Sequence, residues 1–368
     1  MADRITVHRD GKDIYDIVLE SSFSRLGEEV SRLEIAGRKL CIVSDSNVAS
    51  LYLEEVKAQL MPYCSNVGSF VFQAGEEQKN LDTVRELYRY LILNHYDRKD
   101  LLVALGGGVV GDLCGYAAAT YLRGIRFIQV PTTLLSQVDS SIGGKTGVDF
   151  DAYKNMVGAF HMPVLVYSNT ATLLTLPKEQ YASGMGEIIK HGLIKSHGYY
   201  EWIEKHAEEI KHRDVGICST MILESDRIKR DVVEQDPLEL GERALLNFGH
   251  TLGHAIEKLM NFQLLHGQCV ALGCMGAIHL SVLRGMLPAQ KEQMVRQTFL
   301  RFGLPVDLRD LPLNREDILA ATKSDKKMDS GAICFILLRQ IGEAYIDRTV
   351  SDQELLNTIS WMSEARDE

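Results

Sequence analysis

Short apolar segments alternate with amphipathic ones through the first half of the chain. Segments of strand length that are rich in Val, Ile and Phe occur at LCIVS (40–44), SFVFQ (69–73), LLVAL (101–105), IRFIQV (125–130) and VLVY (164–167). Helical spacing between them is clearest in VASLYLEEVKAQL (48–60) and NLDTVRELYRYLILN (80–94). Because strands that alternate with helices form parallel sheets covered by helices, this half predicts a Rossmann-like, mostly parallel α/β domain.

The pattern changes near TLPKEQ (175–180), after which helical spacing dominates as far as about residue 330. A short strand pair (333–338 and 343–346) and a final helix follow. A chain of 368 residues is longer than one hydrophobic core usually serves. We therefore expect an α/β domain over residues 1–175 and an all-α C-terminal domain over residues 176–368, with the strand pair as a minor element.

Composition and charge narrow the class of protein. Apolar residues make up 45% of the chain and charged residues 24%, as in ordinary globular proteins. A net charge of −10 argues against nucleic acid or an anionic membrane as a bulk partner. The seven cysteines are scattered without a C-x-x-C pair, and no apolar run has the length of a membrane span. These features predict a cytoplasmic protein.

A glycine-rich turn follows one of the predicted strands. LLVALGGGVVGD places Gly106, Gly108 and Gly111 in G-x-G-x-x-G register before a helical pattern, as in turns that hold a dinucleotide pyrophosphate. No acidic residue follows at the usual distance, but Asp45, at the end of an earlier strand, is placed to meet a ribose. The alternative is a tight turn that binds nothing.

Histidines and a carboxylate in the helical half suggest a metal site. His250 and His254 lie four residues apart and therefore share one helix face, and His266 begins a later helix. Glu187 opens an earlier helix. One carboxylate and two imidazoles can bind a divalent ion and leave positions open for a substrate. Spacing alone does not decide which three of the four groups are ligands, and two helical histidines can also be ordinary surface or core residues.

Several cations lie in segments that contain glycine or asparagine. Gathered in one cleft, they would bind a phosphate or carboxylate; taken singly, each suits a solvated surface. Lys145, between glycines in SSIGGKTG, has the surroundings of a loop around a ligand. The other members of this set are Arg123, Lys154 with Asn155, Lys190, Lys229 and Arg243.

Together these segments resemble the 3-dehydroquinate synthase family of sugar-phosphate cyclases over nearly the whole chain. The motifs that carry the resemblance are GEEQKN, GGGVVGD, TYLRG, PTTLLSQVDSSIGGKTG, KNMVGAFHMP, TLLTLP, SGMGEIIKHG, DPLELGERALLNFGHTLGHAIE, LLHGQCVALGC and SDKK. Three positions depart from the usual pattern: Gly186 stands where alanine is usual, Asn169 ends a segment that often holds an acid, and Cys334 replaces a frequent arginine.

The resemblance implies specific roles for residues. Glu187, His250 and His266 would hold zinc or cobalt, with His254 as a polar group at the substrate. NAD would contact Asp45, Asn47, Gly75, Glu76, Glu77, Gln78, Lys79, Gly107, Gly108, Val109, Val110, Gly111, Asp112, Thr132, Thr133, Lys145, Lys154, Thr172, Leu173, Leu174 and Thr175. Catalytic and substrate contacts would come from Asp139, Lys145, Lys154, Asn155, Lys190, Lys229, Arg243, Asn247, His254 and Lys327. Arg123 would reach the phosphate in a neighbouring subunit, which implies a homodimer.

The activity implied by the resemblance is the second step of the shikimate pathway. The family converts 3-deoxy-D-arabino-heptulosonate 7-phosphate to 3-dehydroquinate and phosphate through transient oxidation by NAD, phosphate elimination, re-reduction and an intramolecular aldol closure. The alternatives are a sibling cyclase that makes an inosose or valiolone-type ring, a metal-dependent polyol dehydrogenase, and a binding protein without activity.

Overall fold

The computed structural model describes residues 3–151, 153–237, 239, 241–323, 328–329 and 332–364. The chain forms two compact units. The first comprises Met1–Leu176 and Cys218–Arg230, and the second comprises Pro177–Ile217 and Asp231–Glu368. Helix α8 (Val215–Gln235) thus contributes residues to both units.

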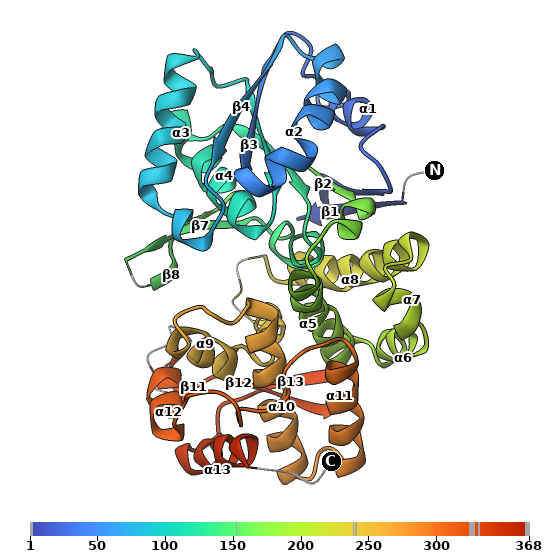
Figure 1. Cartoon of the computed structure of the whole chain (residues 1–368), viewed down its shortest axis with the longest axis vertical. Helices are drawn as coiled ribbons and strands as arrows, with labels where there is room; N and C mark the ends of the chain where they lie inside the picture. Colours follow the sequence, from blue (N-terminus) through green and yellow to red (C-terminus); the bar gives the residue numbers. More distant parts are fainter. Residues whose placement is uncertain are drawn as a thin grey trace. The chain divides into compact units, whose positions relative to one another are not determined.

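Within residues 3–151 and 153–169, seven strands form the sheet of the first unit in the order β1-β2-β9-β6-β5-β3-β4 (Figure 1). Their bounds are β1 Asp3–Arg9, β2 Lys12–Glu20, β3 Lys39–Asp45, β4 Asn66–Phe72, β5 Leu101–Gly106, β6 Arg126–Pro131 and β9 Leu165–Asn169. Only β1 pairs antiparallel in this sheet, and the other pairings are parallel. The predicted mostly parallel sheet is confirmed, with an N-terminal hairpin that the sequence pattern did not reveal.

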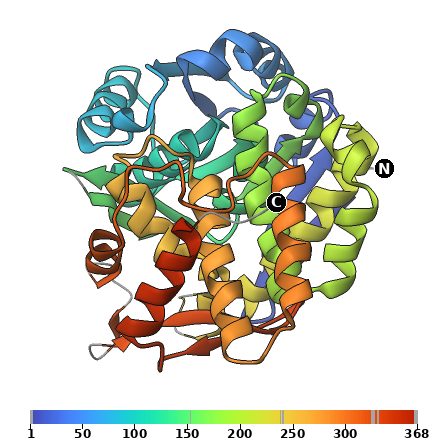
Figure 2. The ribbon, with the colours of Figure 1, turned by 60° about the horizontal axis from the view of Figure 1, so that its bottom comes forward.

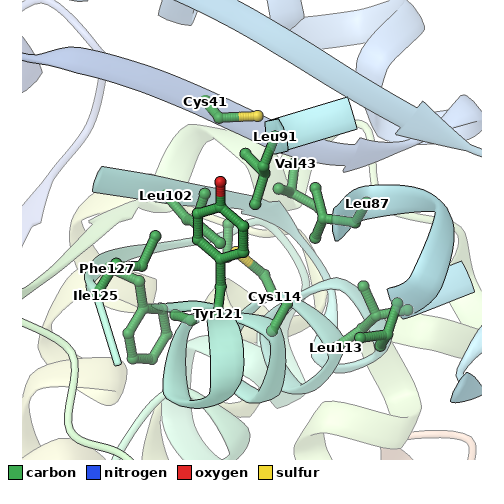
Figure 3. Close-up of a cluster of buried hydrophobic side chains, with 14 of the residues drawn as sticks. Cys41, Val43, Leu87, Leu91, Leu102, Leu113, Cys114, Tyr121, Ile125 and Phe127 are labelled. Atoms are coloured by element: carbon green, nitrogen blue, oxygen red, sulfur yellow. The ribbon is translucent and has the colours of Figure 1, made fainter. Parts of the chain in front are cut away.

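Helices cover both faces of this sheet. Their bounds are α1 Leu26–Ser31, α2 Ser46–Leu60, α3 Leu81–Leu93 and α4 Gly108–Thr120. On one face, α3 and α4 bury side chains against β3 and β5 in the cluster drawn in Figure 3. In that cluster Cys41 and Cys114 are fully buried and pack as small apolar groups. On the other face, α1 and α2 bury residues such as Val30 and Val56 against the same strands.

A separate hairpin follows β6. Strands β7 (Lys145–Phe150) and β8 (Tyr153–Phe160) pair antiparallel, with Gly147 opposite Gly158. A Cβ on Gly158 would lie 2.4 Å from the Thr146 carbonyl oxygen, so the two backbones meet as only glycine allows. The expectation that Lys145 lies in a loop around a ligand is wrong as to the loop, because this residue begins a paired strand.

The second unit is mainly helical. Its helices are α5 Lys178–Lys195, α6 His197–Lys205, α7 Ala207–Lys211, α9 His250–Leu259, α10 His266–Leu283, α11 Ala289–Arg301, α12 Arg315–Lys323 and α13 Asp352–Ser363. Two small hairpins accompany them, β10 (Met328–Asp329) with β11 (Ala332–Ile333) and β12 (Phe335–Gln340) with β13 (Glu343–Asp347). The second hairpin matches the strand pair that the sequence predicts.

Helix α10 is the core of this unit and lies between α11 and α13 (Figures 1 and 2). Its length and composition would suit a membrane span, but 72% of the stretch is buried inside the protein. Glycines allow its neighbours to approach closely: a Cβ on Gly273 would lie 1.8 Å from the Gly249 carbonyl oxygen at the start of α9. A Cβ on Gly267 would come equally close, 1.8 Å, to the Ser183 carbonyl oxygen of α5. The first contact fixes the start of α9 against α10, and the second fixes the start of α10 against α5.

Candidate active site

The residues expected to contact NAD gather at one edge of the sheet in the first unit. Asp45 ends β3, and the segments 75–79, 107–112, 132–133 and 172–175 follow β4, β5, β6 and β9. These five strands run parallel, so their carboxyl ends meet at the same edge. Between β3 and β5 the chain direction along the sheet reverses, which is where open α/β sheets bind ligands.

The glycine turn after β5 leads directly into a helix. Gly107 is the N-cap of α4 and supplies no side-chain cap, so the first backbone N–H groups of this helix remain available to an anion. A Cβ on Gly107 would lie 3.1 Å from Thr133, and one on Gly111 would lie 2.8 Å from Gln129. The glycines therefore bring the start of α4 close to β6. This cradle suits a pyrophosphate, and the residues present fit a dinucleotide.

Asp45 has a structural task beside its expected contact with a ribose. One carboxylate oxygen of Asp45 accepts the backbone N–H groups of Asn47, at 2.9 Å, and of Val48, at 3.0 Å, and so caps α2. The cap fixes the carboxylate at the carboxyl end of β3. An adenosine ribose would meet a rigidly held acceptor there.

The other expected contacts of the first unit lie on several elements. Lys229, in the part of α8 that belongs to the first unit, forms an ion pair with Asp139 and also donates to its carbonyl oxygen. Lys154 lies 3.3 Å from a carboxylate oxygen of Glu76. Arg123 is exposed at the end of a 3₁₀ turn after α4, with a φ of +69°. The structure thus joins Lys229 to Asp139 and leaves Arg123 at the surface.

The groups expected to bind a metal come together in the second unit, where α5, α9 and α10 meet (Figure 1). Donor atoms of Glu187, His250 and His266 lie within 4.8 Å of one another. The Nε2 atoms of His250 and His266 are 3.7 Å and 3.6 Å from Oε1 of Glu187. Ligands at about 2.1 Å from a tetrahedral ion lie about 3.4 Å apart. The spacing therefore fits one shared divalent ion.

A second set of three groups shares His266 with the first. Donor atoms of His254, Glu257 and His266 also lie within 4.8 Å of one another. The two ring nitrogens of His266 point to different carboxylates: Nε2 to Glu187, and Nδ1 to Glu257 at 3.6 Å. Metal-binding imidazoles commonly use one nitrogen for the ion and the other for a carboxylate. The ring of His254 lies 5.1 Å from that of His250 and 6.0 Å from that of His266.

The two carboxylates change the protonation of His266 in the metal-free protein. Burial lowers the pKa of His266, but hydrogen bonds and charges from Glu187 and Glu257 outweigh it and raise the pKa to about 10. Loading a metal ion must therefore displace a proton from His266.

Glu257 was not singled out from the sequence. It lies seven residues after His250 and three after His254, so it shares their helix face, and its side chain is buried. The spacing H-x-x-x-H-x-x-E is the sequence feature that could have indicated Glu257. It is easily overlooked, because an acidic residue near the end of an amphipathic helix usually faces solvent.

Three expected substrate contacts of the second unit lie on α5 and on the segment before α9. Lys190 forms a buried ion pair with Glu187 and donates to the Leu246 carbonyl oxygen at 2.7 Å. Arg243 donates to the Pro237 carbonyl oxygen at 2.8 Å, and Asn247 donates to Glu239 at 2.8 Å. Lys327 lies outside the described residues.

Comparison with known proteins identifies the family. The sequence model of the 3-dehydroquinate synthase N-terminal region matches residues 69–183, and that of the C-terminal region matches residues 184–328. The 3-dehydroquinate synthase of Acetivibrio thermocellus is 42% identical over 346 residues, which cover 94% of this chain and 95% of that protein.

Solved structures share the fold. The 2-epi-5-epi-valiolone synthase from Streptomyces hygroscopicus with NAD⁺ and Zn²⁺ bound is 27% identical, with a TM-score of 0.87 over 98% of this chain and 99% of that chain. The 2-deoxy-scyllo-inosose synthase complexed with carbaglucose-6-phosphate, NAD⁺ and Co²⁺ is 25% identical, with a TM-score of 0.86 over 98% and 99%. The resemblance drawn from the motifs is confirmed: the chain belongs to the 3-dehydroquinate synthase family, within the sugar-phosphate cyclases.

Proposed function

We propose that this member of the family converts 3-deoxy-D-arabino-heptulosonate 7-phosphate to 3-dehydroquinate and phosphate. The main support is that Glu187, His250 and His266 offer donor atoms at metal-ligand spacing in a chain that matches the family along nearly its whole length. The glycine turn after β5 adds a site with the geometry for a dinucleotide. Both groups that the reaction needs therefore have residues that fit them.

NAD and one zinc or cobalt ion are the proposed cofactors, with the contacts that the family pattern assigns. Bound to these residues, the ion would polarise a substrate hydroxyl while NAD accepts a hydride and later returns it. The support from relatives is that two solved sugar-phosphate cyclases carry NAD⁺ with Co²⁺ or Zn²⁺. We propose Glu187, His250 and His266 as the ligands.

The chain's own residues would bind and orient the substrate. Lys190 and Arg243 would hold its charged groups, since ammonium and guanidinium groups match carboxylates and phosphates. His254, whose ring borders those of both proposed imidazole ligands, would exchange a proton with a substrate oxygen. Lys229, held by Asp139, would keep its ammonium in a fixed position for the phosphate end.

We also retain three wider proposals. Residues 1–175 would act as the NAD-binding domain and residues 176–368 as the metal- and substrate-binding domain. The enzyme would be a homodimer in which the exposed Arg123 reaches the neighbouring subunit. It would work in the cytoplasm. This proposal is supported by the seven cysteines, which all lie among the described residues and are free thiols, as is usual in a reducing compartment.

Phosphate release tests the function. The purified protein, supplied with zinc or cobalt and NAD, should release one phosphate per heptulosonate phosphate and form 3-dehydroquinate without accumulating NADH. A polyol dehydrogenase would accumulate NADH from a polyol, and a sibling cyclase would leave the heptulosonate phosphate unchanged. Absence of phosphate release from this substrate would refute the proposal.

A further inference from the structure

Lys79 is a buried cation that the family pattern assigns only to NAD. It lies at the end of the turn Glu76–Gln78 that follows β4, and it is 4% exposed. Its Nζ is 2.7 Å from a carboxylate oxygen of Asp112 and 2.6 Å from Oδ1 of Asn155. These contacts come from two different elements, the helix after the glycine turn and the β7–β8 hairpin. The ammonium of Lys79 therefore joins the dinucleotide edge to the hairpin.

The contact with Lys79 fixes which way the Asn155 amide points. An ammonium group only donates hydrogen bonds, so the atom of Asn155 that faces it must be the oxygen. The Asn155 NH₂ group consequently points away from Lys79, and no hydrogen bond from it to another described residue is present. Asn155 thus offers two donor hydrogens in a direction that Lys79 sets.

The backbone around Asn155 is held by the same network. Asn155 has a φ of +53°, a conformation that asparagine tolerates better than most residues. Its N–H donates to Oδ1 of Asp149 at 2.8 Å, and the Asp149 N–H donates to the Lys79 carbonyl oxygen at 2.7 Å. Lys79 therefore restrains Asn155 twice, through its ammonium and, by way of Asp149, through its carbonyl.

The charge of Lys79 persists despite its burial. Burial lowers the pKa of Lys79, but the carboxylates of Asp112 and Glu76 raise it by more, so the net shift is upward. The side chain remains a cation, and so a donor, throughout the neutral pH range.

We propose that Lys79 is a positioning residue for the substrate: it turns the Asn155 carboxamide so that its NH₂ group donates to an oxygen of the sugar-acid phosphate. This inference rests on the proposed function, in which Asn155 contacts substrate. Its consequence is that Lys79 acts on substrate affinity through Asn155, and not mainly on NAD.

A double-mutant cycle tests this role. Lys79→Met removes the donor, and Asn155→Gly removes the amide while accepting the positive φ. We expect each single variant to raise the KM for the heptulosonate phosphate about tenfold, the scale of a hydrogen bond to a charged partner. The double variant should have the same KM as Asn155→Gly alone. NAD affinity, measured by calorimetry, should change less than threefold.

The matched control is Lys39→Met in the same unit, because Lys39 also donates to two acceptors, the carbonyl oxygens of Asn94 and His95 at 2.9 Å and 2.8 Å. Its KM should equal that of the wild type. If Lys79→Met does not fold, the double variant Lys79→Met/Asp112→Asn takes its place, because it removes both charges of the buried pair. Its KM is then compared with that of Asp112→Asn.

The outcomes separate this inference from the proposed function. The positioning role would be overturned if the KM increases of the two single variants multiplied in the double variant. It would also be overturned if Lys79→Met lost NAD affinity by as large a factor as its KM rises. In either case, phosphate release by the wild type would still support the proposed function. If the wild type released no phosphate, the function would fail. The restraint that Lys79 places on the β7–β8 hairpin is then tested by amide hydrogen exchange over residues 145–160. Faster exchange in Lys79→Met than in Lys39→Met would support this restraint. Exchange in Lys79→Met that is unchanged from the wild type would overturn it.

Discussion

Replacing Lys190 by methionine should weaken the second unit far more in the metal-free protein than in the metal-loaded protein. Glu187 is 0% exposed and Lys190 is 1% exposed, one turn apart on α5. Removing one partner of a buried ion pair costs about 3–5 kcal/mol, and the charged His266 offsets only part of this loss because its Nε2 lies 3.6 Å from Glu187. The carbonyl oxygen of Leu246 also loses its donor, which lies at 2.7 Å. A divalent ion on Glu187 would replace the missing positive charge.

Thermal unfolding of metal-free and zinc-saturated protein measures this effect. For a unit of this size, about 3–5 kcal/mol corresponds to a Tm decrease of about 6–20 °C. We expect this decrease in metal-free Lys190→Met, and a rise on zinc addition that exceeds the rise of the wild type.

The matched control is Lys195→Met on the same helix. Lys195 pairs with Glu242 at the surface, where the two side chains are 25% and 45% exposed, so its loss should cost no more than about 1 kcal/mol. Equal destabilisation by the two substitutions, or a zinc effect no larger in Lys190→Met than in the wild type, would refute the reasoning.

Three further predictions concern other parts of the molecule. Burial raises the pKa of Asp347, but hydrogen bonds from Thr349 and Arg284 lower it below its ordinary value. The ionised Asp347 therefore stabilises the folded protein above a pH of about 4, and this stabilisation is lost as the pH falls through the lowered pKa. Arg284→Ala should lower the free energy of unfolding, measured in urea, by about 1–2 kcal/mol at pH 7 and by less in acid. Gly267→Ala should lower the Tm and the metal content, because its Cβ would lie 1.8 Å from a carbonyl oxygen of α5. Mixing inactive Arg123→Ala and His250→Ala subunits should restore about a quarter of the activity, because half of the random dimers would hold one complete site.

Each of these predictions has a clear contrary result. A cost of Arg284→Ala that does not change with pH would show that its ion pairs contribute little. Gly198→Ala, whose Cβ would meet nothing within 4 Å, is the control for the glycine prediction, and equal effects of the two substitutions would contradict it. Absence of complementation in the mixed dimers would place Arg123 in its own subunit's site, and full activity of Arg123→Ala alone would place it outside any site.

The parallel sheet could be predicted because its strands are buried on both faces. β5 is buried at every position from Leu101 to Gly106, so the sequence shows an unbroken apolar run. The β1–β2 and β7–β8 hairpins could not be predicted in the same way. In β8 the exposed positions include Tyr153 and Met156, so the apolar and polar residues do not sort between a buried and a solvent face. Pairing in this hairpin depends on two glycines that meet across the strands.

The metal cluster could be predicted only in part for a related reason. Helical spacing places His250 and His254 on one face, but it does not show which ring turns toward Glu187. That choice depends on the approach of α10 to α5 and α9, which rests on glycine contacts far apart in sequence. Glu257 escaped notice because its role depends on the opposite nitrogen of His266. Spacing indicates the candidates, and tertiary packing brings them together in two sets that share His266.

Metal analysis of three purified variants tests the central claim most directly. If Glu187, His250 and His266 hold the ion, His250→Ala and His266→Ala should contain almost no metal after dialysis, whereas His254→Ala should retain one ion per chain and lose turnover. Loss of the ion from His254→Ala together with retention by His250→Ala would place the ion in the other cluster, with Glu257 as ligand, and would contradict the account.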